Sequence, residues 1–139
     1  MGKIVLFCAP TNLGLRLPEV FSVPGCSKAP EALREAGLYR FFIEMRGIDG
    51  GATIPGQYSD KISAGRIRNE EEILKYSKKI QERITGILES GNTPLVIGGD
   101  CILLLGIGLA LKRRVAMDLS TSMAILISAI LVILANVRA

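Results

Sequence analysis

Two short apolar runs stand out along the first hundred residues. Residues 3–9 are almost continuously apolar and end at Pro10, and Leu95, Val96 and Ile97 form a second run. Continuous rather than alternating apolar runs are typical of strands buried on both faces, as in a parallel sheet covered by helices. We therefore predict two buried strands in an α/β fold.

Helical spacing dominates the chain between residues 69 and 91. Asn69 precedes three glutamates in a pattern that resembles a capping box, which predicts a helix start. We interpret the glutamates at 70–72 as favourable charges at that start rather than as catalytic groups. Apolar residues then recur on one helical face until Gly91, namely Ile73, Tyr76, Ile80, Ile84, Ile87 and Leu88. This predicts an amphipathic helix of about five turns.

Two other helices and two loops complete the predicted organisation. Residues 29–31 (Ala-Pro-Glu) open a short helix that Gly37 ends, and an apolar helix follows residue 101 and runs to the basic residues 112–114. Residues 10–30 and 47–65 are rich in glycine, proline or other turn formers and are predicted to be long loops. Such loops serve binding or gating, or are plain surface connections.

Composition excludes several classes of protein. With 139 residues, half of them apolar and 22% charged, the chain is one folded domain rather than a disordered or fibrous protein. It contains no histidine, which excludes a Ser-His-Asp triad, a Cys-His dyad and any histidine-ligated metal. The net charge of +4 includes no basic block and the chain has no tryptophan, so nucleic-acid binding is not expected.

The cysteines point to a reducing compartment. Cys8, Cys26 and Cys101 are odd in number and far apart, and residues 1–7 lack the features of a secretory leader. We therefore expect no disulfide framework and a cytoplasmic location.

The turn at residues 98–101 (Gly-Gly-Asp-Cys) is the best candidate site. It follows a predicted buried strand, and ligands of parallel α/β sheets bind outside such strand ends. Asp100 could cap the next helix or orient a metal ligand, and Cys101 could be a metal ligand or a small buried apolar residue. Residues 106–108 (Gly-Ile-Gly) are no nucleotide motif, because Leu111 occupies the third glycine position and the pair lies within a helix.

The turn also carries a resemblance. The chain resembles the arginase and ureohydrolase family, whose members have a strand followed by Gly-Gly-Asp-His. The resemblance covers residues 1–114 and rests on short motifs in the family's order: 10–15 (PTNLGL), 29–34 (APEALR), 54–56 (IPG), 68–70 (RNE) and 94–101 (PLVIGGDC). It implies a three-layer α/β/α arginase-like parallel sheet, two manganese ions, and hydrolysis of a small linear guanidino or amidino substrate by metal-activated water.

The chain departs from that family pattern in its ligands. Cys101 replaces the first histidine ligand, and a thiolate suits zinc or iron better than manganese. The family's Asp-x-His-x-Asp and later Asp-x-Asp segments are missing, so we expect a fold truncated to its N-terminal part and an inactive chain. If a metal binds, Cys101 is the expected ligand, with Asp100 in support.

Residues 115–139 differ abruptly from the rest, since Asp118 and Arg138 are their only charged residues. Shifting the reading frame back by one nucleotide permits residues 115–128 to become a buried strand that ends in Asp-x-His-x-Asp. We therefore predict an arginase-like part at 1–114 and an apolar, helical, out-of-frame tail at 115–139.

Two alternatives stay open. The first is a small membrane-anchored protein with a span at residues 119–135. The second is a non-catalytic pseudo-enzyme that binds a small ligand or a full-length relative through the loops at 12–25 and 47–65. Homo-oligomer formation also stays open.

Overall fold

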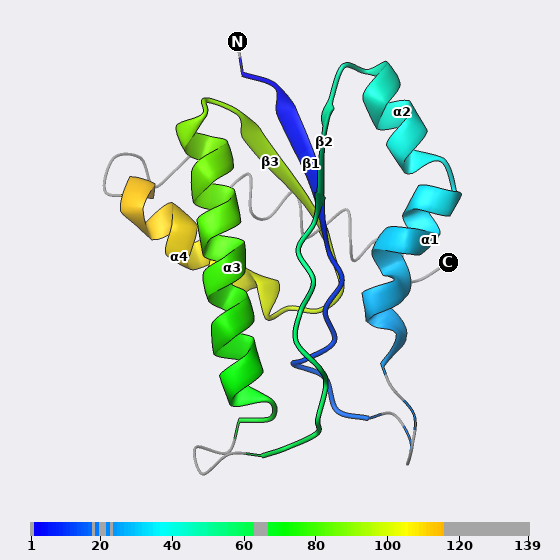
Figure 1. Ribbon diagram of the computed structural model, residues 1–139, viewed down its shortest axis with the longest axis vertical. Helices are drawn as coiled ribbons and strands as arrows, with labels where there is room; N and C mark the ends of the chain where they lie inside the picture. The colour runs from blue at the N-terminus through cyan, green and yellow to red at the C-terminus, as the bar shows by residue number, and fades with distance from the viewer. Residues whose placement is uncertain (1, 18, 20–21, 23, 63–66, 116–139) are drawn as a thin grey trace.

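In the described part of the chain, three strands form a parallel sheet between two helical layers (Figure 1). The computed structural model describes residues 2–17, 19, 22, 24–62 and 67–115. Helices α1 (Ala29–Glu35) and α2 (Leu38–Glu44) lie on one side of the sheet, and α3 (Glu70–Glu89) and α4 (Leu103–Val115) lie on the other. This arrangement confirms the predicted three-layer α/β/α class.

The central strand is β1 (Ile4–Ala9). It pairs on one side with β3 (Thr93–Gly98), in an unbroken parallel register from Ile4 opposite Thr93 to Ala9 opposite Gly98. On its other side it pairs in parallel with β2 (Ile48–Ala52), with an irregularity between Leu6 and Cys8. The strands predicted at 3–9 and 95–97 are therefore confirmed, as is their parallel pairing, but only β1 is buried as predicted, because Leu95, Val96 and Ile97 of β3 are partly exposed.

The prediction of a loop throughout residues 47–65 is wrong for β2. Two of the five residues of β2 are glycines, which normally weaken a strand. At Gly50 the glycine is needed, because a Cβ there would lie 2.8 Å from Val5 Cγ1 and 2.9 Å from the Leu6 carbonyl oxygen. Gly50 is thus required by the close contact between β2 and β1, although glycine has a low intrinsic propensity for strands.

The first helical layer consists of two short helices. Helix α1 begins at Ala29 with Pro30 in its first turn, as predicted, and it is preceded by a 3₁₀ helix at Gly25–Lys28. Gly37, with a φ of 91°, separates α1 from α2, which the sequence analysis did not predict. Helix α2 buries Tyr39 and Phe42 against the sheet.

Helix α3 follows the predicted apolar spacing, and its residues Ile73, Tyr76, Ile80, Ile84 and Ile87 are buried. The predicted capping box is wrong, because Asn69 has left-handed backbone angles and makes no side-chain cap. Glu71 and Glu72 instead form ion pairs with Lys75 at 2.7 and 3.0 Å. The two glutamates lie in the first turn, as expected for helix-start electrostatics.

The pair Gly106 and Gly108 lies within α4, as predicted. A Cβ at Gly106 would lie 2.7 Å from the Ser77 carbonyl oxygen and 2.8 Å from Ile80 Cβ, so this glycine lets α4 approach α3 closely. Gly108 has no neighbour within 4 Å of such an atom. The first glycine therefore serves helix packing rather than nucleotide binding.

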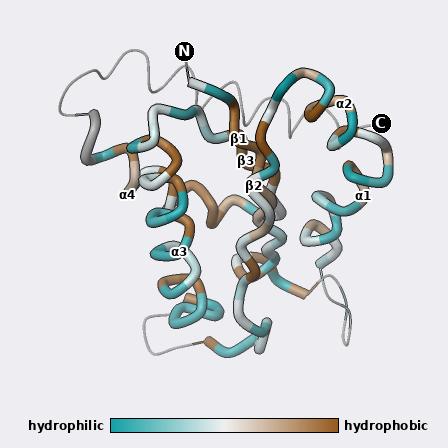
Figure 2. Tube along the Cα trace, turned by 45° about the horizontal axis from the view of Figure 1, so that its top comes forward, coloured by the Kyte–Doolittle hydropathy of each residue, from teal (hydrophilic) through white to brown (hydrophobic). Residues whose placement is uncertain are grey.

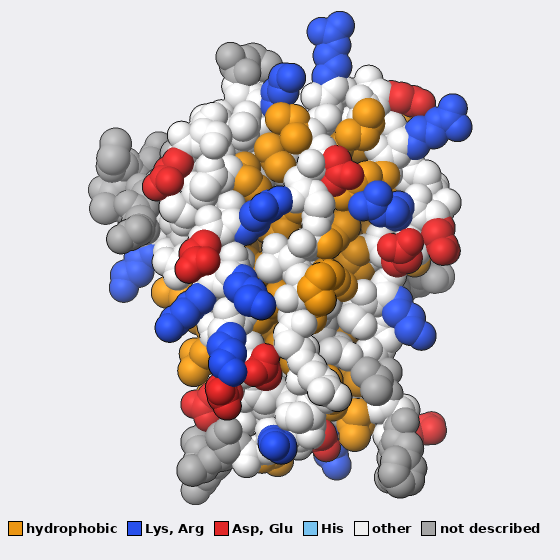
Figure 3. Space-filling model, in the orientation of Figure 1, with side chains coloured by type: hydrophobic (Ala, Val, Ile, Leu, Met, Phe, Trp, Pro, Cys, Tyr) orange, Lys and Arg blue, Asp and Glu red, His pale blue; other side chains and the backbone are white. Residues whose placement is uncertain are grey.

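The core forms on both faces of the sheet because side chains alternate along the strands. Figure 2 shows apolar colour concentrated along the strands, whereas along α3 apolar and polar residues follow each other within the turns. Seen from the β2 side, apolar side chains form a band between the charged surfaces of α3 and of the α1–α2 layer (Figure 3). The interior of the layers is thus visible at this edge of the sheet.

The predicted span at 119–135 lies outside the described residues, as does the tail beyond Val115. Within the described ranges, none of the helices combines the length and apolar character that crossing a membrane requires. The boundary at residue 114 stays a prediction.

Candidate functional site

The carboxyl ends of β1 and β3 meet at one edge of the sheet. Ala9 and Gly98 are opposite each other there, and the Gly99 amide donates a hydrogen bond to the Ala9 carbonyl at 3.2 Å. The loop after β1 and the turn at 98–101 therefore lie together. This is the edge at which parallel α/β sheets bind their ligands.

Gly99 packs directly on the loop that follows β1. A Cβ at this position would overlap the carbonyl group of Thr11, so only glycine permits the contact. Thr11 is completely buried, and its hydroxyl accepts a hydrogen bond from the Leu13 amide at 3.3 Å. The space that the missing side chain leaves is thus taken by the protein's own backbone.

Asp100 is buried at this edge, with 8% of its surface exposed. Its Oδ2 atom accepts a hydrogen bond from the Gly14 amide at 2.7 Å, and its Oδ1 atom has no hydrogen-bond partner. Burial raises the pKa of the Asp100 carboxyl, and the Gly14 amide opposes this shift. The carboxylate thus holds the loop after β1 against the turn and keeps one oxygen unused.

Cys101 is exposed, so the interpretation as a small buried apolar residue is wrong. Cys26, from the 3₁₀ helix, lies at the same edge and donates from its thiol to the Thr11 carbonyl oxygen at 3.3 Å. Burial raises the pKa of the Cys26 thiol, with smaller contributions from the nearby Asp100 and Cys101. The Cys26 thiol and the Asp100 carboxyl therefore both lie beside Thr11.

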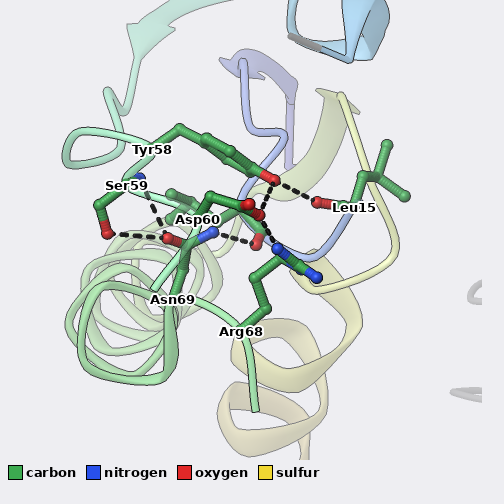
Figure 4. A network of polar contacts seen from close by, with 7 residues as sticks. Leu15, Tyr58, Ser59, Asp60, Arg68 and Asn69 are labelled. Atoms are coloured by element: carbon green, nitrogen blue, oxygen red, sulfur yellow. Dashed lines mark hydrogen bonds and ion pairs between the residues drawn. The ribbon is translucent and has the colours of Figure 1, made fainter. Parts of the chain in front are cut away.

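A polar network holds the loop after β1 in place from its other side (Figure 4). Asn69 donates from Nδ2 to the Leu13 carbonyl at 2.9 Å and accepts from the Ser59 amide and hydroxyl, both at 3.1 Å. Asn69 is 4% exposed and has a φ of 51°. Its side chain is therefore a buried clamp between two loops.

The network continues through Tyr58, whose hydroxyl lies 2.9 Å from the Leu15 carbonyl oxygen and 3.0 Å from Asp60 Oδ1. Asp60 in turn forms an ion pair with Arg68. Both acceptors share the single phenolic proton, so the arrangement joins the two loops through one hydroxyl. The structure thereby fixes the position of the Gly14 amide that holds Asp100.

No sequence pattern indicated that Cys26, Tyr58, Asp60 and Asn69 belong to this edge. The motifs at 10–15 and 68–70 were noted, but no spacing showed that their side chains meet. Their contacts join residues up to 56 positions apart, as between Leu13 and Asn69. Only the fold brings them together.

The described residues do not complete a metal centre. No three His, Cys, Asp or Glu side chains within the described ranges are close enough together to hold a metal ion. Of the two predicted metal residues, Cys101 is accessible and Asp100 is held by Gly14. The described part of the chain therefore does not fit the two manganese ions that the resemblance implies.

Comparison with known families gives a match to a model described as the arginase family, over residues 3–126. The matched range extends beyond residue 114 into the apolar tail. Among curated proteins, none matches the chain.

Solved structures with the same fold include arginases of three Bacillus species. The arginase of Bacillus caldovelox has a TM-score of 0.66 and 23% identity, over 81% of this chain and 38% of its own. An arginase of Bacillus subtilis has a TM-score of 0.65 and 21% identity, over 82% and 36%. The arginase of Bacillus cereus has a TM-score of 0.61 and 23% identity, over 81% and 35%. The chain thus spans little more than a third of these structures.

Proposed function

Because the chain belongs to the arginase family, we propose that it forms the N-terminal part of a metal-dependent hydrolase that cleaves C–N bonds of linear guanidino or amidino compounds. One observation carries the proposal: the turn at 98–101 lies at the carboxyl end of β3, directly against the loop that follows β1. Ligands of parallel α/β sheets bind at this edge. The described residues would then form one wall of the pocket that binds the guanidino or amidino substrate.

We propose Cys101 as the one metal ligand that the described residues contribute, with Asp100 in support. The exposure of Cys101 supports this role, and so does the unused Oδ1 atom of Asp100 beside it. A thiolate favours zinc or iron over manganese. In intact family members the metal activates water as a Lewis acid, but no such step is assigned to this chain.

We propose that the chain is inactive on its own, because its described residues do not bring together three His, Cys, Asp or Glu side chains that could hold a metal ion. Its proposed location is cytoplasmic, since all three cysteines are unpaired and free thiols suit a reducing compartment.

Metal content of the purified full chain tests the proposed ligand. Zinc and manganese are added separately, free metal is removed by gel filtration, and bound metal is measured by elemental analysis. We expect zinc to be retained and manganese to be lost. Cys101→Ala should lose the zinc, whereas the matched control Cys26→Ala, which removes the neighbouring thiol, should keep it.

Full zinc content in Cys101→Ala would show that Cys101 is not the ligand. Release of urea from arginine by the manganese-treated chain would show that the chain is not inactive. The two outcomes concern different parts of the proposal and can be distinguished.

We also propose that the residues after 114 are out of frame, and the coding DNA tests this. If the alternate frame lacks Asp-x-His-x-Asp at residues 115–128, the proposal is wrong. Retention of the chain in carbonate-washed membranes would instead favour a span at 119–135.

A further inference from the structure

The two outer strands of the sheet differ in how their backbone groups are occupied. In β2, two backbone groups are hydrogen-bonded to side chains: the Arg83 guanidinium donates to the Gly50 carbonyl oxygen, and the Gly51 amide donates to Asp49 Oδ1 at 2.8 Å. Such contacts, together with the charge of Asp49, make a strand a poor template for a further strand. Strand β2 is therefore built as a protected outer strand.

The outer edge of β3 is open in the described part of the chain. The amides at both ends of β3, those of Thr93 and Gly99, donate to β1 carbonyls or the residue before them at 2.9 and 3.2 Å. Because the backbone groups of successive strand residues point to opposite sides, the groups of Val96 and Gly98 point away from β1. The described sheet ends at β3, so these groups have no strand to pair with there.

The side chains of β3 are those of an interior strand. Leu95, Val96 and Ile97 are apolar and partly exposed, and β3 has no charged residue. Exposed edge strands usually carry charges that prevent pairing. Pro94 faces the open side at the beginning of β3, where it removes one amide and leaves those of Val96 and Gly98 available. The composition therefore fits a strand with neighbours on both sides.

The path of the chain leads to this open edge. The crossover from β1 to β2 passes through the α1–α2 layer, and the crossover from β2 to β3 passes through α3 on the opposite face and returns across β1 (Figure 1). The two crossovers therefore have the same hand, as is the rule for parallel strands. Helix α4 lies on the α3 side, so a third crossover of that hand carries the chain after Val115 to the open side of β3.

We propose that the open edge of β3 is paired in parallel by a segment of the chain's own tail, residues 123–127 (MAILI), which lie outside the described ranges. The tail at 116–139 is long enough, since a strand of five or six residues spans about 20 Å. The segment is continuously apolar, as β1 is.

The pairing requires only backbone groups and apolar side chains, so the proposal holds for either reading frame of the tail and does not rest on the proposed function. For these five residues it replaces the helix that apolar composition predicts, because a helix would leave the backbone groups of β3 unpaired.

Nuclear magnetic resonance of the isotope-labelled full chain tests the pairing. Amide hydrogen exchange is measured at Val96 and Gly98 at two protein concentrations, with the amides of Leu95 and Ile97, which face β1, as references. We expect slow exchange at Val96 and Gly98 that does not change on dilution, and nuclear Overhauser contacts between Val96 and residues 123–127.

Two proline variants of the tail distinguish a strand from a helix. Successive amides of a strand point to opposite sides, so only one of Ile125→Pro and Leu126→Pro removes an amide that faces β3. We expect that variant to accelerate exchange at Val96 or Gly98 about tenfold, and the other variant is its matched control. Slow exchange of the amides that face β1 shows that both variants remain folded.

Three results would overturn the proposal. Fast exchange at Val96 and Gly98 in the full chain would show that the edge of β3 stays open. Protection that disappears on dilution would identify a second copy of the chain as the partner. Equal effects of the two proline variants, or helical contacts within residues 123–127, would show that the tail does not pair as a strand.

Discussion

The two faces of the sheet are held by different means, although the same strand supplies both. Val5, Phe7 and Ala9 of β1 point into a large apolar core with α3 and α4. Leu6 and Cys8 point to the other face, where their buried partners are Tyr39 and Phe42. Because successive side chains of β1 point to opposite faces of the sheet, the same strand contributes to a large core and to a small one.

Polar and ring contacts supplement the small core. The Tyr39 hydroxyl donates to Asp49 Oδ1 at 2.8 Å, and the Arg34 guanidinium lies 3.5 Å from the centre of the Tyr39 ring. On the large face, the interior positions of α3 are almost all apolar. We infer that most of the stability comes from the α3–α4 face and that the α1–α2 layer is attached by a few specific contacts.

Truncation of one phenylalanine on each face should give the largest difference. Phe7 is completely buried in the large core and Phe42 is 8% exposed in the small one. We expect Phe7→Ala to lower the free energy of unfolding by about 3–5 kcal/mol, and Phe42→Ala to cost about 1–2 kcal/mol less. Urea unfolding measures both. Equal losses would show that the two faces contribute equally.

Asn69→Ala should have the next largest effect. The substitution removes the hydrogen bonds to Leu13 and Ser59 and leaves the buried Leu13 carbonyl without its Asn69 donor. We expect a loss of about 2–3 kcal/mol, at roughly 1 kcal/mol for each bond. Asn92→Ala is the matched control, because the Asn92 side chain accepts one exposed bond, from the Lys3 amide. A loss no larger than that of the control would contradict the clamp.

The strands and the long helix that were predicted from sequence are those with a continuous or a periodic apolar pattern. Strands β1 and β3 and helix α3 each carry enough apolar residues for their pattern to indicate burial. Strand β2 has little apolar content, and its pairing depends on the absence of a side chain at Gly50. Propensity cannot show this, because the reason for the glycine lies in β1.

The site was predicted only in part for a related reason. The turn at 98–101 is contiguous, so its place after a buried strand could be recognised. The clamp at Asn69 was mistaken for a helix cap, since its partners Leu13 and Ser59 belong to loops without any periodic signal. The place of Cys26 at this edge likewise depends on a contact that no local pattern shows, its hydrogen bond to the Thr11 carbonyl.

Two glycines of α4 allow a matched test within the large face. Gly106→Ala places a methyl group 2.7 Å from the Ser77 carbonyl oxygen, and we expect a loss of about 1–2 kcal/mol. Gly108→Ala adds a methyl group in open space, and we expect a gain of about 0.5–1 kcal/mol from helix propensity. Chemical unfolding of both variants measures the pair. Stabilisation by both substitutions would show that α4 does not pack closely on α3.

Tyr39→Phe should have the smallest effect and tests the polar attachment of α2. The phenylalanine ring keeps the contact with Arg34 and loses only the hydroxyl, whose acceptor Asp49 still receives the Gly51 amide at 2.8 Å. We expect a loss of about 1 kcal/mol at neutral pH.

The dependence of stability on alkaline pH distinguishes a contribution of the Tyr39 hydroxyl from one of ring packing alone. Burial and the hydrogen bond to Asp49 raise the pKa of Tyr39, so the folded protein keeps a phenolic proton that the unfolded chain releases near its ordinary pKa of about 10. The stability of the native protein should therefore fall as the pH rises above that value, and Tyr39→Phe should fall less steeply. Burial also raises the pKa of Tyr76 on the opposite face, so some alkaline loss should remain in the variant. Identical slopes in the two proteins between pH 9 and 11 would mean that the Tyr39 hydroxyl does not attach α2 to β2, and the small face would then depend on its apolar and ring contacts.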